Sequence, residues 1–329
     1  MPLGGEAPEY SRHLGRIRTE QFQAALDRFG LGSLVRAEPI GSGITRQNCF
    51  VSSSAGRYVL RGGPLWPNQF AEERFLAEQI HLHTQVPAPW PYLVDDSTDI
   101  FGWSYALMPR LPGLPWPDFW EGRDAGARLG VARALGRGLA LLQELRWPFA
   151  GAYDASAGAV VPFPAGCEQR VIPGIRKGFE AARALTPDQV GDADLAYVEG
   201  VIGRAEPALR VAFEPRFVMP DYKEDNVVLE PTAEGGRVCG VFDLGGHFGD
   251  GEAALARQRA MYLERDPALA AAFVGEYLAA RPPRPGFAER LAVYQLNERL
   301  EIWEWARRTG VARWDPALSL RAWLLPFVE

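Results

Sequence analysis

Two polar residues five positions apart mark the segment of this chain best suited to chemistry. Asp221 and Asn226 lie within residues 217–229, and an apolar strand follows the asparagine directly. This is the layout of a phosphoryl-transfer loop, in which the aspartate orients a substrate hydroxyl and accepts its proton while the asparagine holds a metal ion. Lys223, two residues after the aspartate, can bring a positive charge to the transferred phosphate. We therefore expect Asp221 and Lys223 to be catalytic and Asn226 to be a metal ligand.

A second segment supplies the other ligand that such chemistry needs. Residues 240–246 read Gly-Val-Phe-Asp-Leu-Gly-Gly, so an apolar strand delivers Asp243 into a glycine-rich turn. A carboxylate at a rigid strand end, with flexible backbone beside it, suits Mg²⁺ bound against phosphates. Short motifs of common polar residues arise by chance, and the succession of two such segments is what makes this pattern specific. The sequence thus predicts Mg²⁺ ligation by Asn226 and Asp243.

Composition and charge exclude several other classes of protein. The 329 residues are 47% apolar and 23% charged, with a net charge of −6, which argues against sequence-independent binding of nucleic acid. The three cysteines, Cys49, Cys167 and Cys239, are widely spaced and form neither a zinc pattern nor a disulfide framework. The chain shows no leader pattern and no apolar run of membrane-spanning length. We expect a cytoplasmic monomer or homodimer with no nucleic-acid or membrane partner.

Apolar periodicity divides the chain into a β-rich part and a mainly helical part. In the first part we expect helices over 19–29 and 68–83 and strands over 34–40, 48–52, 57–61, 91–94 and 102–108. In the second part we expect a long helix over 124–145, a hairpin of strands 226–230 and 237–242, and further helices. The predicted fold is α+β, with two lobes around a central cleft. Residues 1–108 would form the nucleotide-binding lobe, 109–113 the hinge, and 114–329 the catalytic and substrate-binding lobe.

Together these features resemble the aminoglycoside phosphotransferase and choline kinase-like family, which shares the two-lobed protein kinase-like fold. The similarity runs from about residue 40 to about residue 256, and residues 218–229 and 240–250 carry most of its specificity. The second of these segments ends in a Gly-Asp pair, Gly249-Asp250, that resembles the pair following the metal-binding aspartate in this family. The resemblance implies ATP and Mg²⁺ as cofactors and transfer of the γ-phosphoryl group to a hydroxyl of a small-molecule acceptor.

The resemblance also implies which residues of the first lobe bind the nucleotide. Arg61 stands where the family usually has an ATP-contacting lysine, and Glu73 is expected to pair with it, with Glu72 and Glu78 as alternatives. A glycine-containing loop would cover the phosphates, and one carbonyl and one amide of the hinge would contact adenine. The cofactor-binding residues implied in this way are Gly41, Ser42, Gly43, Arg61, Glu73, Pro109 and Leu111.

Departures from the family pattern leave the acceptor open. The catalytic loop usually begins His-Gly-Asp, whereas this chain has Met219-Pro220-Asp221, and Lys223 replaces a frequent histidine. The helix after Asp250 usually carries another aspartate, and residues 253–255 are apolar here. These differences indicate a divergent branch with the same chemistry.

A C-terminal helix is the best candidate for the acceptor site. Within residues 287–308, Tyr294, Glu298, Glu301 and Trp305 recur at helical spacing, so that one face combines carboxylates with aromatic rings. Such a face suits an ammonium group. The alternative is that the aromatic residues pack in the core while the glutamates face water. We expect these four residues, with Asp250, to contact the acceptor.

The combined prediction is an ATP-dependent small-molecule kinase whose acceptor is an aminoglycoside or another antibiotic. A metabolite alcohol, such as an amino alcohol, sugar or nucleoside, is the alternative acceptor. A nucleotide-binding pseudoenzyme is the alternative to catalysis, suggested by Arg61 and by the Met219-Pro220 replacement.

Overall fold

The computed structural model describes residues 9–40, 47–233, 235–311, 314–315 and 317–329. The chain divides into two units. The first contains residues up to Gly113 together with residues 153–159 and 239–245, and the second contains the rest. The chain thus leaves the first unit at the end of the expected hinge, but two later segments return to it. One of these carries Asp243, so a division at a single point in the sequence does not describe the units fully.

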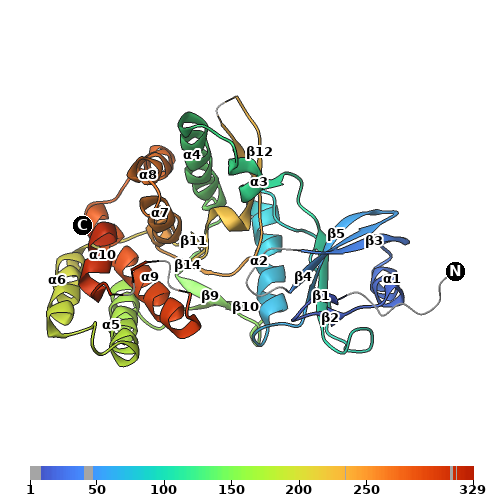
Figure 1. The fold of residues 1–329 in the computed structure, drawn as a ribbon, viewed down its shortest axis with the longest axis horizontal. Helices are drawn as coiled ribbons and strands as arrows, with labels where there is room; N and C mark the ends of the chain where they lie inside the picture. The colour runs from blue at the N-terminus through green and yellow to red at the C-terminus, as the bar shows by residue number, and fades with distance from the viewer. Residues whose placement is uncertain (1–8, 41–46, 234, 312–313, 316) are drawn as a thin grey trace. The chain divides into compact units, whose positions relative to one another are not determined.

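The first unit is a sheet with two helices, as the apolar pattern predicts (Figure 1). Its elements are β1 (Glu9–Ser11), β2 (Gly15–Arg16), α1 (Thr19–Arg28), β3 (Leu34–Pro39), β4 (Asn48–Ser53), β5 (Gly56–Gly62), α2 (Gln69–His83), β6 (Leu93–Asp95) and β7 (Tyr105–Pro109). Strands β3-β4-β5-β7-β6 lie in this order, and each neighbouring pair is antiparallel. The predicted strands and helices are confirmed with small shifts of their ends. The β1–β2 hairpin is too short to give a periodic signal and was not predicted.

The core of this unit fixes β5, the strand that carries Arg61. The apolar face predicted for α1 is buried, with Phe22 and Leu26 packed in one cluster with Leu60 of β5 and Leu107 of β7. Burying a side chain of this size stabilises the fold by about 1.5–3 kcal/mol. Arg61 therefore extends from a strand whose neighbours are held on both sides.

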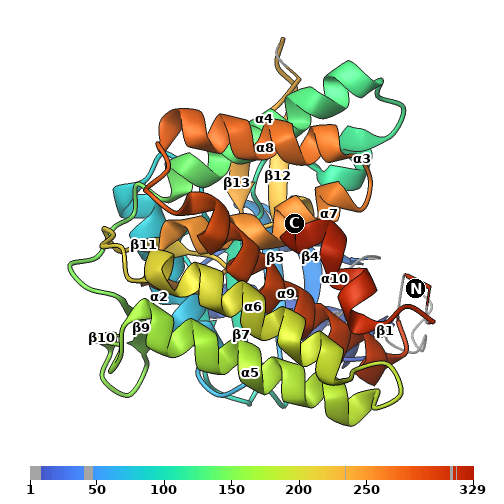
Figure 2. The ribbon, with the colours of Figure 1, turned by 90° about the vertical axis from the view of Figure 1, so that its left-hand side faces the viewer.

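The second unit is mainly helical, as predicted (Figure 2). Its elements are β8 (Leu114–Pro115), α3 (Trp116–Trp120), α4 (Ala125–Leu142), β9 (Gly151–Asp154), β10 (Ala159–Pro162), α5 (Cys167–Leu185), α6 (Asp192–Leu209), β11 (Arg216–Val218), η1 (Glu224–Asn226), β12 (Val227–Glu230), β13 (Arg237–Val241), β14 (His247–Gly249), η2 (Gly251–Ala254), α7 (Leu255–Leu263), α8 (Pro267–Ala280), α9 (Phe287–Thr309) and α10 (Leu320–Val328). Strands β9, β10 and β13 cross the division between the units. No helix in the described ranges has the length and apolar character needed to cross a membrane.

Two details of this unit differ from the prediction. The strand expected over 226–230 begins one residue later, because Asn226 belongs to the 3-10 turn η1. The helix expected over 124–145 spans Ala125–Leu142, and the Asp124 side chain caps it by accepting a hydrogen bond from the Ala127 amide at 2.8 Å. The predicted hairpin is confirmed, since β12 and β13 are neighbours in a sheet that β8 completes.

Helix α9 is the central helix of this unit. It packs against α5, α6, α7 and α10, and Figure 2 shows α5, α6 and α9 running alongside one another. Its apolar side chains, among them Val293, Leu300 and Trp303, belong to the large core cluster. Because α9 is fixed from several sides, polar side chains on its remaining face have defined directions.

The backbones of helices α4 and α8 approach each other closely at Gly136, and this contact gives a stability test. A Cβ added to Gly136 would lie 2.3 Å from the Phe273 carbonyl oxygen, a main-chain atom that no side-chain rotation moves. Gly203 in α6 has no heavy atom within 4 Å of such a Cβ.

We expect Gly136→Ala to lower the free energy of unfolding by about 1–3 kcal/mol through overpacking. Gly203→Ala should raise it by about 0.5–1 kcal/mol through helix propensity. Urea denaturation of both variants measures this, and equal stabilisation by both would contradict the close packing.

Candidate active site

The loop between β11 and β12 holds the predicted catalytic residues on a buried frame. Phe217, Met219 and Tyr222, which lie between or beside the polar positions, are all fully buried. The Tyr222 hydroxyl donates a hydrogen bond to the carbonyl of Leu135 in α4 at 2.8 Å. Because the apolar side chains are fixed in the core, the polar side chains between them keep one direction.

The three predicted polar residues of this loop meet at the Asp221 carboxylate. Lys223 Nζ lies 2.7 and 3.0 Å from its two oxygens. Asn226 Nδ2 donates to Oδ2 and to the main-chain carbonyl of Asp221, each at 2.9 Å. Because the amide nitrogen faces Asp221, the Oδ1 of Asn226 is the atom that can take a cation. The Asp221 side chain is 42% exposed and thus open to a small molecule.

Arg257 of α7, which the sequence analysis missed, also faces Asp221. Its Nε lies 3.6 Å from Asp221 Oδ1, and its Nη1 lies 2.9 Å from Glu298 Oε1 on α9. The family pattern drew attention to residues 253–255, where an aspartate was expected. The arginine lies only two residues further on, so the helix after Asp250 contributes a cation in place of the missing acid.

A buried carboxylate anchors the loop from within the second unit. Glu224 is fully buried and forms an ion pair with Arg265, whose guanidinium lies 4.8 Å above the ring of Trp116. The Glu224 amide donates to Gln258 Oε1 at 2.8 Å. Burial raises the pKa of Glu224 to about 7, against the opposing charge of Arg265.

In the first unit, Arg61 joins two carboxylates. Its Nη2 lies 3.1 Å from Glu73 Oε1 and 2.6 Å from Asp243 Oδ1. Of the three glutamates considered, Glu73 is thus the one paired with Arg61, and it also accepts hydrogen bonds from Tyr92 at 2.5 Å and Gln69 at 2.8 Å. Burial raises the pKa of Glu73, and the charge of Arg61 opposes this rise. Arg61 is buried, so it is not a solvated residue at a strand end.

Asp243 has the features of a metal ligand. Its φ is 57°, in the left-handed region that few residues other than glycine adopt, although aspartate is among them. Such a conformation persists where the surrounding structure holds it, and it occurs often at functional sites. The carboxylate is 44% exposed, so an ion can reach it. Carboxylate and amide oxygens are hard ligands, and Asp243 and Asn226 both fit Mg²⁺ chemically.

The remaining residues implied for nucleotide binding are only partly described. Gly41, Ser42 and Gly43 lie outside the described residues. Pro109 is the last residue of β7, and Leu111 follows it in the hinge, both half-buried.

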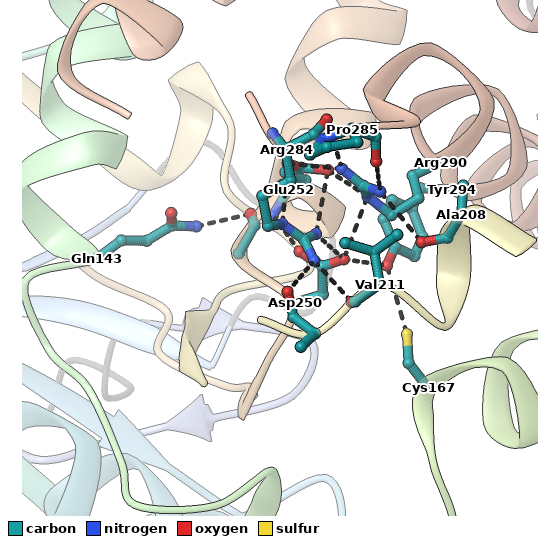
Figure 3. Close-up of polar contacts among 12 residues, drawn as sticks. Gln143, Cys167, Ala208, Val211, Asp250, Glu252, Arg284, Pro285, Arg290 and Tyr294 are labelled. Carbon is teal, nitrogen blue, oxygen red and sulfur yellow. Dashed lines mark hydrogen bonds and ion pairs between the residues drawn. The ribbon is translucent and has the colours of Figure 1, made fainter. Parts of the chain in front are cut away.

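Asp250 is enclosed in a network of arginines within the second unit (Figure 3). Its Oδ2 accepts hydrogen bonds from Arg284 Nη2 at 2.5 Å and from the Tyr294 hydroxyl at 2.7 Å. The neighbouring Glu252 accepts from Arg290 Nε at 2.6 Å. Both carboxylates are buried and neutralised. Asp250 therefore stabilises the packing of α9 with η2, and an acceptor could use it only by breaking these bonds.

The four predicted acceptor residues of α9 occupy two environments. Tyr294 and Glu298 are buried, and Glu298 accepts a hydrogen bond from Arg299 Nε at 2.5 Å in addition to its pairing with α7. Glu301 and Trp305 are exposed. The alternative of buried aromatic residues with solvated glutamates does not hold, because exposure changes along this stripe from Tyr294 and Glu298, which are buried, to Glu301 and Trp305, which are exposed, while Trp303 on another face stays in the core. Spacing alone cannot show that change.

Comparisons with known sequences identify the relatives of this chain. A sequence model of the phosphotransferase enzyme family matches residues 36–287. Homoserine kinase from Methylobacillus glycogenes is 41% identical over 78 residues, which are 23% of this chain and 24% of that enzyme. The matched part thus spans about a quarter of the length of that relative.

Solved structures share the fold. A protein from Ralstonia eutropha, provisionally classed as an aminoglycoside phosphotransferase, has a TM-score of 0.65 at 18% identity and covers 95% of this chain and 97% of its own. The GDP complex of wild-type aminoglycoside 2'-phosphotransferase-IIIa has a TM-score of 0.59 at 16% identity, covering 88% and 92%. These similarities confirm the predicted α+β, kinase-like fold.

The buried Glu224 gives a prediction about stability and pH. Its folded-state pKa of about 7 lies above the ordinary value of 4.5, so its contribution to stability is fully present below pH 4.5 and is lost as the pH rises through 7. Glutamine does not titrate. The stability of wild type relative to Glu224→Gln should therefore fall by about 3 kcal/mol between about pH 4.5 and about pH 8.

Urea denaturation across this range measures the difference, with Glu214→Gln as a control because that carboxylate is exposed and pairs with Arg146 at the surface. A difference between wild type and Glu224→Gln that does not change with pH would contradict the raised pKa.

Proposed function

The chain belongs to the phosphotransferase enzyme family, and we propose that it transfers the γ-phosphoryl group of ATP to a hydroxyl of a small molecule. The observation that carries this proposal is the Asp221 carboxylate, which is exposed and oriented by Lys223 and Asn226 from its own loop. Membership of the family supports an enzyme over a nucleotide-binding pseudoenzyme.

In this proposal Asp221 accepts a hydrogen bond from the acceptor hydroxyl and points its oxygen at the γ-phosphorus. The new oxygen–phosphorus bond forms as the bond from the γ-phosphorus to the β,γ-bridging oxygen breaks, and the hydroxyl proton passes to a carboxylate oxygen of Asp221. The bonds from Lys223 and Asn226 keep the carboxylate in one rotamer, so the hydroxyl is held in line for attack.

The cofactor roles follow from the chemistry of the available atoms. Asn226 Oδ1 and the Asp243 carboxylate would be the ligands of Mg²⁺, which, when bound, offsets the charge of the phosphates. Arg61 is a buried cation whose Nη2 already contacts Asp243, and its guanidinium would also contact phosphate oxygens. The other nucleotide contacts are assigned by family resemblance to Gly41, Ser42, Gly43, Pro109 and Leu111, with Glu73 orienting Arg61.

Two kinds of acceptor remain in this proposal. The solved structures, which are similar to this chain in fold, suggest an aminoglycoside or another antibiotic. A metabolite alcohol is suggested by the stretch that is 41% identical to homoserine kinase. A screen of ADP release with Mg²⁺-ATP across aminoglycosides, macrolides, nucleosides, sugars and amino alcohols tests the proposal. Absence of ADP release with every acceptor, at measurable ATP binding, would count against it.

The role of Asp221 gives a prediction about catalysis. Asp221→Asn removes the proton acceptor but keeps the size of the side chain, so phosphoryl transfer should fall by at least about 10²-fold while the Kd for ATP changes little. ADP release and isothermal titration with ATP measure the two quantities separately. Transfer at close to the wild-type rate would remove Asp221 from the mechanism.

Lys223 gives a further prediction about catalysis, and the other lysine of the chain is its control. Lys223 and Lys177 are the only two lysines in the sequence. A point charge beside the transferring group stabilises the transition state more than bound ATP, so Lys223→Ala should lower kcat by about 10²-fold with a smaller change in the KM for ATP. Lys177→Ala, on the exposed surface of α5, should leave both unchanged. A kcat of Lys223→Ala within about threefold of wild type would show that the lysine takes no part in catalysis.

A further inference from the structure

We infer that the acceptor carries a carboxylate near its reacting hydroxyl, and that Arg257 and Arg170 of the second unit bind this carboxylate. The inference rests on the proposed function and narrows its substrate class. It reverses the charge expected from the sequence, since the carboxylates of α9 suggested an ammonium-bearing acceptor.

Two of the three acidic residues predicted to bind a cation, Asp250 and Glu298, are already paired with arginines, whereas Glu301 is exposed and accepts a hydrogen bond from Asn297. Asp250 is bound by Arg284 at 2.5 Å, and Glu298 is bound by Arg257 at 2.9 Å and by Arg299 at 2.5 Å. Taking one of these buried carboxylates for an ammonium group would leave an arginine without its partner, which is strongly unfavourable. The site therefore offers little to a polycationic acceptor such as an aminoglycoside.

Arg257, beside Asp221, has N–H groups that its ion pair with Glu298 does not use. Its Nη1 is paired with Glu298 at 2.9 Å, and its buried Nε lies 3.6 Å from Asp221 Oδ1, an ion-pair contact too long for a hydrogen bond. The Arg257 side chain is 19% exposed, unlike that of Arg299, which is 3% exposed. Arginine presents its N–H groups in a planar fork that matches a carboxylate. An anion bound by Arg257 would lie next to the hydroxyl that Asp221 orients.

Arg170 of α5 supplies a second cation. Its guanidinium carbon lies 3.3 Å from the centroid of the Phe163 ring, which holds the side chain flat and partly shielded from water. Among the described residues no carboxylate forms an ion pair with it. Burial lowers the pKa of Arg170, and nearby Cys167 and Tyr294 act against this change. A partly buried arginine without an acidic partner is a ready site for an anionic ligand.

Arg170 lies near Tyr294 of α9, and Arg257 pairs with Glu298 of the same helix. Cys167, one turn before Arg170 on α5, lies with its Sγ 3.4 Å from the Tyr294 hydroxyl. Glu298, one turn after Tyr294, contacts Arg257. Tyr294 and Glu298 are one turn apart on α9, so the two arginines lie near neighbouring positions of one helix. Two forked cations near one helix would suit a small hydroxylated carboxylate.

A charge series of acceptors tests the inference. The panel has two series, with glycerate, glycerol and serinol in the first and gluconate, sorbitol and glucamine in the second. Each series runs from an anion through a neutral molecule to a cation with similar hydroxyls. Kanamycin is added as a polycation. ADP release with Mg²⁺-ATP is measured for each. We expect kcat/KM to be at least about tenfold higher for the anion than for the neutral member of a series, as one charge-assisted contact would give. Preference for the neutral or cationic members, or for kanamycin, would overturn the inference.

Variants of the two arginines locate the effect. Arg170→Gln and Arg257→Gln should each raise the KM for the anionic acceptor at least about tenfold and leave the KM for ATP within about twofold. Arg170→Lys keeps the charge but not the fork, and its KM should lie between those of wild type and Arg170→Gln. Arg176→Gln is the matched control, because Arg176 lies on the same helix, is exposed and pairs with Glu199. An unchanged acceptor KM in folded Arg170→Gln and Arg257→Gln, checked by thermal unfolding, would contradict the inference.

Failure of the inference is distinguishable from failure of the proposed function. If ADP is released with neutral or cationic acceptors alone, the enzyme is a kinase and only the assignment of the carboxylate is wrong. If ATP binds but no acceptor of any charge releases ADP, the proposed function itself is wrong.

Discussion

The orientation of one carboxylate, that of Asp221, is the constraint on which the rest of the candidate site depends. Its exposed oxygens are held by Lys223 and Asn226, and Arg257 approaches from α7. This arrangement exists because the apolar residues of the same loop are buried and the Tyr222 hydroxyl is tied to α4. A flexible loop with the same polar residues would hold an acceptor hydroxyl in many directions, and the advantage of positioning would be lost.

Buried carboxylates of the second unit are paired with arginines. Glu224, Asp250, Glu252 and Glu298 are all buried, and each has an arginine partner. A buried carboxylate is costly unless paired, and a forked cation can satisfy two groups at once. The consequence for function is that few of these acids are free for a ligand. Charge counted along the sequence therefore overestimates the negative charge that an acceptor meets.

In the first unit, Arg61 stands where the family usually has an ATP-contacting lysine, and its contacts are physically consistent with the role expected of that lysine. Its Nη2 contacts both Glu73 and Asp243. The planar guanidinium suits this double contact, which a compact ammonium makes less readily. The substitution is therefore compatible with an enzyme and does not by itself indicate a pseudoenzyme.

The sequence by itself determined the elements and the loop that carries Asp221, Lys223 and Asn226, because local periodicity and short spacing encode them. It also led to Glu73 as the partner of Arg61, through family resemblance. Only the tertiary structure decided the environment of the acceptor residues. Arg257 reaches Asp221, and Asp250 is enclosed by arginines, through contacts between segments far apart in the chain. Spacing shows which side chains share a helix face, but the charge at a site is set by what packs against that face.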